Sequence, residues 1–308
     1  MTHTALVSHP DCWLHSMGAE HPESPERLTA LYAALSAAGL DKFLSKHEAP
    51  EASRAQLYRA HAPAYVDALF ELQPEHGIVH LDPDTAFGPH TLKAALRATG
   101  AGILATELVV AGKVRNAFCA VRPPGHHAER LQAMGFCFFN NIAVAARHAI
   151  EVLGLSRVAI IDFDVHHGNG TENIFAADPR VLMVGFFQHP LFPYSGLQPL
   201  APHLINVALP SGSTGERMQA VFEAVWLPAL LAHRPQMLFV SAGFDAHCED
   251  EMASLGMVDA DFAWISQRIR SFAEAHCEGR IVSTLEGGYN LDALGRCVAL
   301  HLAALSHP

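Results

Sequence analysis

Residues 157–171 read RVAIIDFDVHHGNGT, an apolar run that passes directly into acidic residues and histidines. The nearly all-apolar part, 157–163, predicts a β-strand that is covered on both faces. Similar short runs lie at 4–8, 114–121, 181–186, 204–208, 236–241 and 280–285. Longer stretches with helical patterning lie at 25–38, 89–111, 142–153, 216–233, 260–276 and 291–305. This alternation of strands and helices predicts an α/β protein with a doubly wound parallel sheet.

The composition is that of a globular protein with a large core. Of the 308 residues, 50% are hydrophobic and 17% are charged, which excludes a disordered chain. No internal repeat, low-complexity tract or long Gly/Ser linker interrupts the sequence, which predicts one domain over residues 1–308. The 20 basic and 31 acidic residues give a net charge of −11, which argues against nucleic acid as a partner.

The sequence also indicates a cellular setting. No apolar run reaches the roughly 18 residues of a membrane span, and the N-terminus lacks the basic start of a secretory signal. We therefore expect no membrane partner. The six cysteines form no C-x-x-C pair, which predicts reduced, mostly buried thiols in a cytoplasmic protein. The sequence is compatible with a homo-oligomer but does not specify an oligomeric state.

Polar segments follow four of the predicted strands. They are RPPGHHAE (122–129), DFDVHHGNGT (162–171), SAGFDAHCED (241–250) and EGGYN (286–290). Histidine, the commonest metal ligand, is unusually frequent in this chain, with 21 residues. Because ligands of open parallel sheets gather at the carboxyl ends of the strands, we expect these segments to form one site.

The densest of these segments is a candidate metal site. In an extended chain, residues two apart share a face, which groups Asp162, Asp164 and His166. Such closely packed groups repel or desolvate one another unless a cation lies among them. Two of them with Asp245 would form a His/Asp₂ set with an open position, typical of catalytic zinc, although Fe²⁺ suits the same ligands. The alternative is that the acids cap a helix at 170–177 and the histidines only pack.

His126 and His127 follow an Arg-Pro-Pro-Gly turn whose two prolines restrict the backbone. Adjacent imidazoles beside a metal-bound water could act as general base and as electrostatic or acid partner. Asp162 and Asn169 are available to set their tautomers. A lone histidine is more often structural, but a doubled one after a rigid turn favours a catalytic role.

Three aromatic residues have two interpretations each. Tyr289 follows two glycines at a strand end, so its hydroxyl could donate to a developing oxyanion, or its ring could only plug the sheet end. Phe136 and Phe192 are either core aromatics or the walls of a slot, and the sequence does not separate these alternatives.

Taken together, the motifs resemble those of the zinc-dependent histone deacetylase family, especially class II members and bacterial deacetylase-like amidohydrolases. The motifs that carry the resemblance are HPESPERL (21–28), VRPPGHHAE (121–129), MGFCFFNN (134–141), DFDVHHGNGT (162–171), SAGFDAH (241–247) and LEGGYN (285–290). They span nearly the whole chain in family order. The resemblance implies a hydrolase of linear amide bonds with the three-layer αβα arginase/deacetylase fold, whose mainly parallel central sheet has about eight strands.

Carried over residue by residue, the resemblance implies a zinc ligand set of Asp164, His166 and Asp245. It implies His127 as the general base and His126 as its electrostatic partner. Asn169 would stand behind His127, as in class II members, and Asp162 behind His126. Tyr289 would polarise the amide carbonyl of the substrate.

The resemblance also implies a substrate channel. Phe136 and Phe192 would line a narrow passage for an aliphatic stem, and Gly135 would add a main-chain contact. Asp84 would hold the substrate backbone from a loop, and Arg27 would line an internal channel.

Potassium is the second metal that the resemblance implies. The first potassium would lie beside the zinc, held mainly by Asp162, Asp164 and His166. A second position maps to carbonyl groups near Phe175, Asp178 and Val181. Gly185 departs from the family pattern, because many members place a serine there that contacts the first potassium.

The implied substrate is an acylated lysine side chain of a peptide or protein, cleaved to acetate and a free amine. The alternative is an acetylpolyamine or another small acylated amine. Polyamine-specific relatives carry long loop insertions or a gatekeeper acid near the last zinc ligand. Here the gatekeeper position falls on Met252, with Glu251 adjacent. An apolar residue at this position disfavours a polyamine substrate.

Two other classes of protein compete with this interpretation. A binuclear manganese hydrolase of the arginase type needs more aspartate and histidine ligands than the three found here. A non-catalytic metal-binding or acyl-lysine reader protein predicts a damaged histidine pair or a missing tyrosine, and both are intact.

Overall fold

A computed structural model describes residues 4–72 and 74–306. Its centre is an eight-stranded sheet in the order β2-β1-β5-β10-β9-β6-β7-β8, in which all neighbouring strands are parallel. The strands are β1 (Thr4–Ser8), β2 (Leu44–Glu48), β5 (Asn116–Cys119), β6 (Val158–Asp162), β7 (Val181–Gln188), β8 (Leu204–Leu209), β9 (Leu238–Ala242) and β10 (Ile281–Leu285). A short antiparallel hairpin consists of β3 (Val79–His80) and β4 (Ala86–Phe87). The predicted parallel sheet of about eight strands is confirmed.

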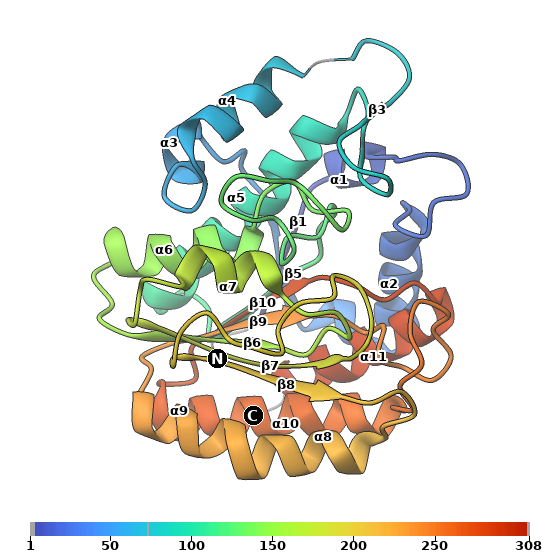
Figure 1. The fold of residues 1–308 in the computed structure, drawn as a ribbon. Helices are drawn as coiled ribbons and strands as arrows, with labels where there is room; N and C mark the ends of the chain where they lie inside the picture. Colours follow the sequence, from blue (N-terminus) through green and yellow to red (C-terminus); the bar gives the residue numbers. More distant parts are fainter. Residues whose placement is uncertain (1–3, 73, 307–308) are drawn as a thin grey trace.

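Helices cover both faces of the sheet (Figure 1). The helices are α1 (Asp11–Leu14), α2 (Glu26–Ala37), α3 (Arg54–Leu57), α4 (Pro63–Glu71), α5 (Thr91–Val110), α6 (Asn141–Glu151), α7 (Asn169–Phe175), α8 (Gly215–Val221), α9 (Leu227–His233), α10 (Asp259–His276) and α11 (Leu291–Ser306). A 3-10 turn, η1 (Leu40–Lys42), follows α2, and a π-helical turn, η2 (Phe222–Trp226), joins α8 to α9. In the view of Figure 1, α5, α6 and α7 lie above the sheet and α8 to α11 lie below it. Among the described residues, no helix is long and apolar enough to cross a membrane.

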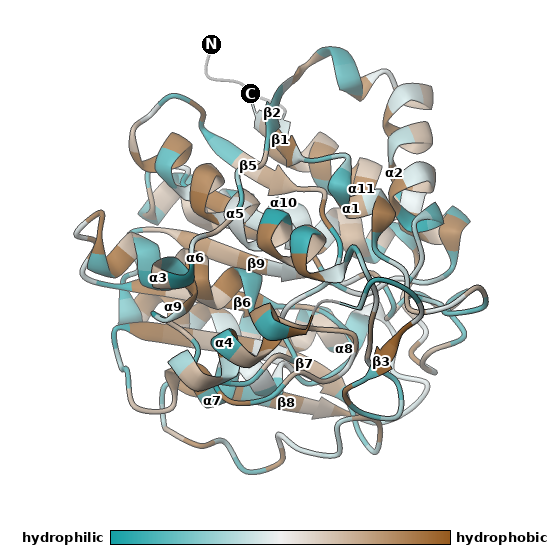
Figure 2. Ribbon diagram, turned by 90° about the horizontal axis from the view of Figure 1, so that it is seen from above, coloured by the Kyte–Doolittle hydropathy of each residue, from teal (hydrophilic) through white to brown (hydrophobic). Residues whose placement is uncertain are grey.

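The core lies on both faces of the central strands. Every residue of β6, β9 and β10 is buried, as their apolar sequences predict. Figure 2 shows hydrophobic colours along β6 and β9. The six cysteines are unpaired and five of them are buried, which agrees with the expectation of free thiols.

The sequence did not indicate every element. Strand β2 is absent from the predicted strands because its sequence, LSKHE, has no apolar run. It lies at the sheet edge and alternates between less and more exposed residues, so half of its side chains need not be apolar. Helix α4 was not predicted either, and it begins with Pro63 at its first turn.

The strand order brings the four polar segments together. The strands that precede them, β5, β10, β9 and β6, are consecutive neighbours in the sheet. Because all four are parallel, their carboxyl ends lie along the same edge. Segments that begin at residues 122, 162, 241 and 286 are therefore adjacent in space although they are far apart in sequence.

Candidate active site

A buried group of two aspartates and one histidine lies at the ends of β6 and β9. Asp164, His166 and Asp245 each offer one ligand atom, and these atoms all lie within 4.8 Å of one another. The Nδ1 atom of His166 lies 3.0 Å from Oδ1 of Asp164 and 3.2 Å from Oδ2 of Asp245. All three predicted ligands are therefore brought together.

The hydrogen bonds around this group fit a bound cation. Oδ1 of Asp245 accepts the Val165 N–H at 3.0 Å, and Oδ2 of Asp164 accepts the Gly287 N–H at 2.8 Å. In contrast, Oδ2 of Asp245 is buried without a hydrogen-bond partner. Burial and the neighbouring Asp164 raise the pKa of Asp245 to about 6. An orphaned carboxylate oxygen that faces an imidazole and a second carboxylate suits a divalent metal with mixed N and O ligands.

Two glycines allow the main chain to approach these carboxylates. A Cβ on Gly243 would overlap the carboxylate of Asp164. A Cβ on Gly287 would overlap Oδ2 of Asp245 and would lie 2.6 Å from Oδ2 of Asp164. Gly243 of SAGFD and Gly287 of EGGYN are thus explained by close packing on the ligand set.

The histidine pair lies beside the ligand group, with 4.0 Å between the two ring centroids. Nδ1 of His126 is 3.0 Å from Oδ2 of Asp162, and Nδ1 of His127 is 2.7 Å from Oδ1 of Asn169. The amide of Asn169 in turn donates to Oε1 of Glu129 at 2.8 Å, which leaves its carbonyl oxygen to accept from His127. Both predicted partners are present. Because each of them binds Nδ1, the hydrogen bond does not involve Nε2 of either histidine.

The two histidines have opposite electrostatic environments. Burial lowers the pKa of His126, but the carboxylates of Asp164 and Asp162 outweigh this effect and raise it well above its ordinary value. Burial and the neighbouring imidazoles of His126 and His166 hold the pKa of His127 well below its ordinary value. The pair therefore combines a cationic and a neutral imidazole, which is the arrangement of an acid and a base at one pH.

Glu286, the first residue of the EGGYN segment, is a site residue for which the sequence indicated no role. Its Oε2 accepts the main-chain N–H groups of Gly125, at 2.7 Å, and His126, at 3.1 Å. Oε1 accepts the Ser241 hydroxyl at 3.3 Å, and burial raises the pKa of Glu286 to about 7. The side chain thus fixes the turn that carries the histidine pair. The sequence feature that could have identified Glu286 is its position as an acidic residue directly after the strand predicted at 280–285.

Tyr289 packs between two predicted channel residues. Its ring lies edge-on to Phe136, with 5.9 Å between centroids, and the guanidinium of Arg27 lies 4.9 Å from its centroid. Arg27 also donates to the carbonyl of Gly288 at 2.7 Å and to that of Glu286. Burial raises the pKa of the Tyr289 phenol well above its ordinary value, so the hydroxyl stays protonated and can donate.

Phe192 and Gly135 lie against the histidine pair. The Phe192 ring is 5.1 Å from that of His127 and 6.3 Å from that of His166, both edge-on. Gly135 has a φ of +55°, and a Cβ there would lie 2.5 Å from the His127 ring and 2.9 Å from the Phe192 ring. Only glycine fits this position without displacing one of the two rings.

Asp84 lies in the turn between β3 and β4, where it is exposed. Its carbonyl is 3.2 Å from Nε2 of His21. The next residue, Thr85, accepts the Phe136 N–H with its hydroxyl at 3.0 Å, which connects this turn to the aromatic wall. The role of Asp84 in substrate binding stays a prediction.

The residues predicted for potassium lie in two places. Asp162 ends β6 beside the ligand group, where its Oδ1 accepts the Asp164 N–H at 3.1 Å. Phe175 ends α7 and Val181 begins β7, so the second position lies at the opposite end of the strands. The Asp178 carboxylate in between is paired with Arg147 and Arg180. Both potassium positions stay predictions, as does the effect of Gly185, which pairs with Asp162 across β6 and β7.

The fold and the site together define an α/β protein with a candidate metal site of two aspartates and one histidine at the carboxyl ends of its parallel strands. A sequence profile of the histone deacetylase domain matches residues 21–305. A histone deacetylase-like amidohydrolase of Pseudomonas aeruginosa is 39% identical over 280 residues, which are 88% of this chain and 73% of that protein. A mouse polyamine deacetylase, HDAC10, is 34% identical over 98% of this chain and 48% of its own length. The crystal structure of the HDA15 HD domain has a TM-score of 0.90 and 31% identity, and the match covers 99% of this chain and 88% of that one.

The chain belongs to the histone deacetylase family of amidohydrolases. The predictions of the family, of the fold and of a hydrolase acting on amide bonds are confirmed.

Proposed function

We propose that this protein is a zinc-dependent deacylase, with one catalytic domain over residues 1–308, that hydrolyses the amide of acetylated lysine side chains. One observation carries the proposal: the buried ligand group lies beside the His126–His127 pair, whose environment favours a cationic His126 and a neutral His127. Zinc held by Asp164, His166 and Asp245 would supply a Lewis acid that polarises the amide carbonyl and lowers the pKa of water at the site.

The proton transfers are assigned to the histidine pair. His127 donates its Nδ1 proton to Asn169, so its Nε2 carries a lone pair and can take a proton from the attacking water. The same nitrogen then delivers that proton to the leaving amine, which yields acetate and a free amine. His126, cationic and bound to Asp162, keeps His127 neutral before the attack by its positive charge.

Tyr289 is assigned to the developing oxyanion. Its hydroxyl remains protonated near neutral pH and can donate to the carbonyl oxygen as negative charge accumulates there. Phe192 and Phe136 provide apolar walls that suit the methylene stem of lysine. Asp84 is proposed to bind the substrate backbone from its exposed turn, and Arg27 to line an internal channel behind Tyr289.

The likeness to a polyamine deacetylase supports a second candidate substrate, an acetylated polyamine. Met252 opposes it, because an apolar side chain near the last ligand offers no anionic partner for a second ammonium group.

The experiment compares acetate release from an acetyl-lysine peptide, acetylputrescine and acetylspermidine by zinc-loaded protein, with and without a chelator. We expect chelator-sensitive turnover that favours the peptide. Tyr289→Phe should retain zinc and lower kcat about 100-fold or more, because one oxyanion donor is lost. Turnover that favours the amines would replace the proposed substrate, and turnover of none of the three would refute the proposed activity.

A further inference from the structure

Asp250 is a buried acid that the proposed mechanism does not use. It lies in the loop after Asp245, and only 5% of its surface is exposed. Its Oδ2 accepts two main-chain N–H groups, from Tyr289 at 2.6 Å and from Asn290 at 3.0 Å. Its Oδ1 accepts a third, from Met252 at 3.0 Å. One carboxylate therefore binds its own loop and the segment that carries the candidate catalytic tyrosine.

Arg27 and Asp164 hold this segment before the tyrosine, and Asp250 holds it at Tyr289 itself. Tyr289 follows Gly287 and Gly288, and Gly288 has a φ of +118°, so two residues without side chains precede it. Asn290 caps the following helix, α11, by accepting the Ala293 N–H at 3.0 Å. Asp250 thus adds a negative charge at the N-terminus of α11, where the helix dipole strengthens its bonds.

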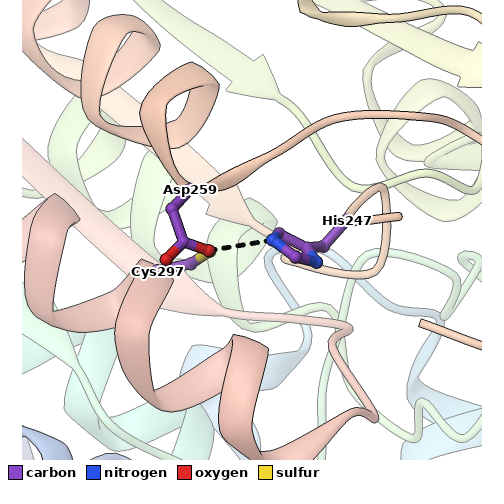
Figure 3. Close-up of side chains that lie close together, drawn as sticks. All are labelled: His247, Asp259 and Cys297. Atoms are coloured by element: carbon purple, nitrogen blue, oxygen red, sulfur yellow. Dashed lines mark hydrogen bonds and ion pairs between the residues drawn. The ribbon is translucent and has the colours of Figure 1, made fainter. Parts of the chain in front are cut away.

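The loop of Asp250 is itself tied to α10 and α11. Figure 3 shows His247 of this loop pointing at Asp259, the first residue of α10, with Nε2 2.9 Å from Oδ1. Arg296 of α11 donates to Asp259 at 2.8 Å and to Glu249 at 2.9 Å. The loop therefore has side-chain contacts with both helices.

The group in Figure 3 has the composition of a metal site, since it contains His247, Asp259 and Cys297. Its hydrogen bonds argue against that role. Nδ1 of His247 accepts the Glu249 N–H at 3.1 Å, so Nε2 carries the proton and donates to Asp259. The guanidinium of Arg296 already neutralises Asp259. The group is a structural tie.

We propose that Asp250 is a positioning residue, which holds the Tyr289 main chain so that the phenol points at the carbonyl of the substrate. The inference rests on the role proposed above for Tyr289. Because Asp250 and the ligand Asp245 lie on one loop, the ligand set and the phenol keep a constant relative position.

The test is Asp250→Asn, which keeps the size of the side chain but offers one accepting oxygen in place of two. Zinc content and KM for the acetyl-lysine peptide should change little. We expect kcat to fall about 10- to 100-fold, because a small displacement of the phenol weakens a bond made only in the transition state. In a Tyr289→Phe background the same substitution should cost less than about twofold, because no phenol is left to position.

Asp259→Asn is the matched control. It removes a carboxylate from the network that holds the same loop, but Asp259 has no contact with the Tyr289 segment. It should lower the melting temperature and leave kcat within about twofold. An equal loss of kcat from Asp250→Asn in both backgrounds, or a loss from Asp259→Asn as large as that from Asp250→Asn, would reduce Asp250 to a merely structural residue.

Hydrogen exchange of the 286–293 segment gives a readout that needs no turnover. The amides of Tyr289 and Asn290 should exchange faster in zinc-loaded Asp250→Asn and at the wild-type rate in Asp259→Asn. Unchanged exchange in Asp250→Asn would overturn the proposal. Faster exchange in a protein that turns over no acetyl-lysine would support the anchor and refute only the function proposed for Tyr289.

Discussion

Single atoms decide how closely the main chain approaches the ligand group. At Gly287, the position of a Cβ is already occupied by the carboxylate of Asp245, and Oδ2 of Asp164 lies 2.6 Å away. The Gly287 N–H also donates to Asp164 at 2.8 Å. This residue therefore orients one ligand and limits the space around both.

Gly287→Ala is predicted to weaken zinc binding. The added methyl group must displace Asp164, Asp245 or both, and we expect a loss of about 10-fold or more in zinc affinity. Competition with a chromophoric chelator measures it. Gly256→Ala is the control, because a Cβ there meets only ordinary contacts, the nearest at 3.5 Å from Thr214. Equal zinc affinities of the two variants would contradict the steric argument.

Among the secondary-structure elements, α11 joins the site to the core through a buried histidine. His301 lies between α10 and β10, with Nδ1 2.7 Å from the Ser266 hydroxyl and Nε2 3.0 Å from the Ser283 hydroxyl. Ser266 donates its own proton to the Phe262 carbonyl, so it accepts from Nδ1, and Nε2 accepts from Ser283. The ring is thus bound as the neutral form, and burial lowers the pKa of His301 to about 3.

This histidine predicts a loss of stability in acid. A histidine whose pKa is lower in the folded than in the unfolded protein makes its full contribution to the free energy of unfolding above about pH 6.5. That contribution falls as the pH drops from about 6.5 toward 3. At pH 5, one such histidine lowers the free energy of unfolding by about 2 kcal/mol. Urea unfolding at both pH 7.5 and pH 5 measures it. His301→Gln should reduce the pH dependence by that amount, whereas an unchanged dependence would show that His301 does not titrate in this range.

Over the whole molecule, a buried ionic network connects the N-terminal segment to the ends of β5 and β10. Glu23 accepts hydrogen bonds from Arg27 and Arg122, and Nε2 of His15 lies 3.4 Å from its Oε2. Arg122 also donates to the carbonyls of Cys12 and His15. Burial raises the pKa of Glu23, but Arg122 and His15 outweigh this and hold it well below its ordinary value.

Glu23→Gln is predicted to destabilise the protein strongly. It leaves two guanidinium groups buried without their counter-charge, which costs about 3–5 kcal/mol in comparable buried pairs. Glu274→Gln is the control, because Glu274 pairs with Arg115 and Arg270 near the surface and should cost about 1 kcal/mol or less. Chemical denaturation at neutral pH compares the two, and similar losses of unfolding free energy would contradict the predicted difference.

Local patterns in the sequence were enough to predict the alternation of strands and helices and the four polar segments that form the site. These signals are local, since Asp164 and His166 lie two residues apart and a buried strand shows as an apolar run. The edge strand β2 was missed because an edge strand does not need such a run.

The contacts between distant groups could be read from the folded chain alone. The order β5-β10-β9-β6 lets Glu286 accept the main-chain N–H of His126, which is 160 residues away in the sequence. It also lets Asp250 accept the main-chain N–H of Tyr289, which is 39 residues away. It also resolved Phe136 and Phe192 as rings that pack on Tyr289 and His127. Local sequence patterns reflect burial and backbone preference, whereas contacts between distant segments depend on strand order, which no local pattern specifies.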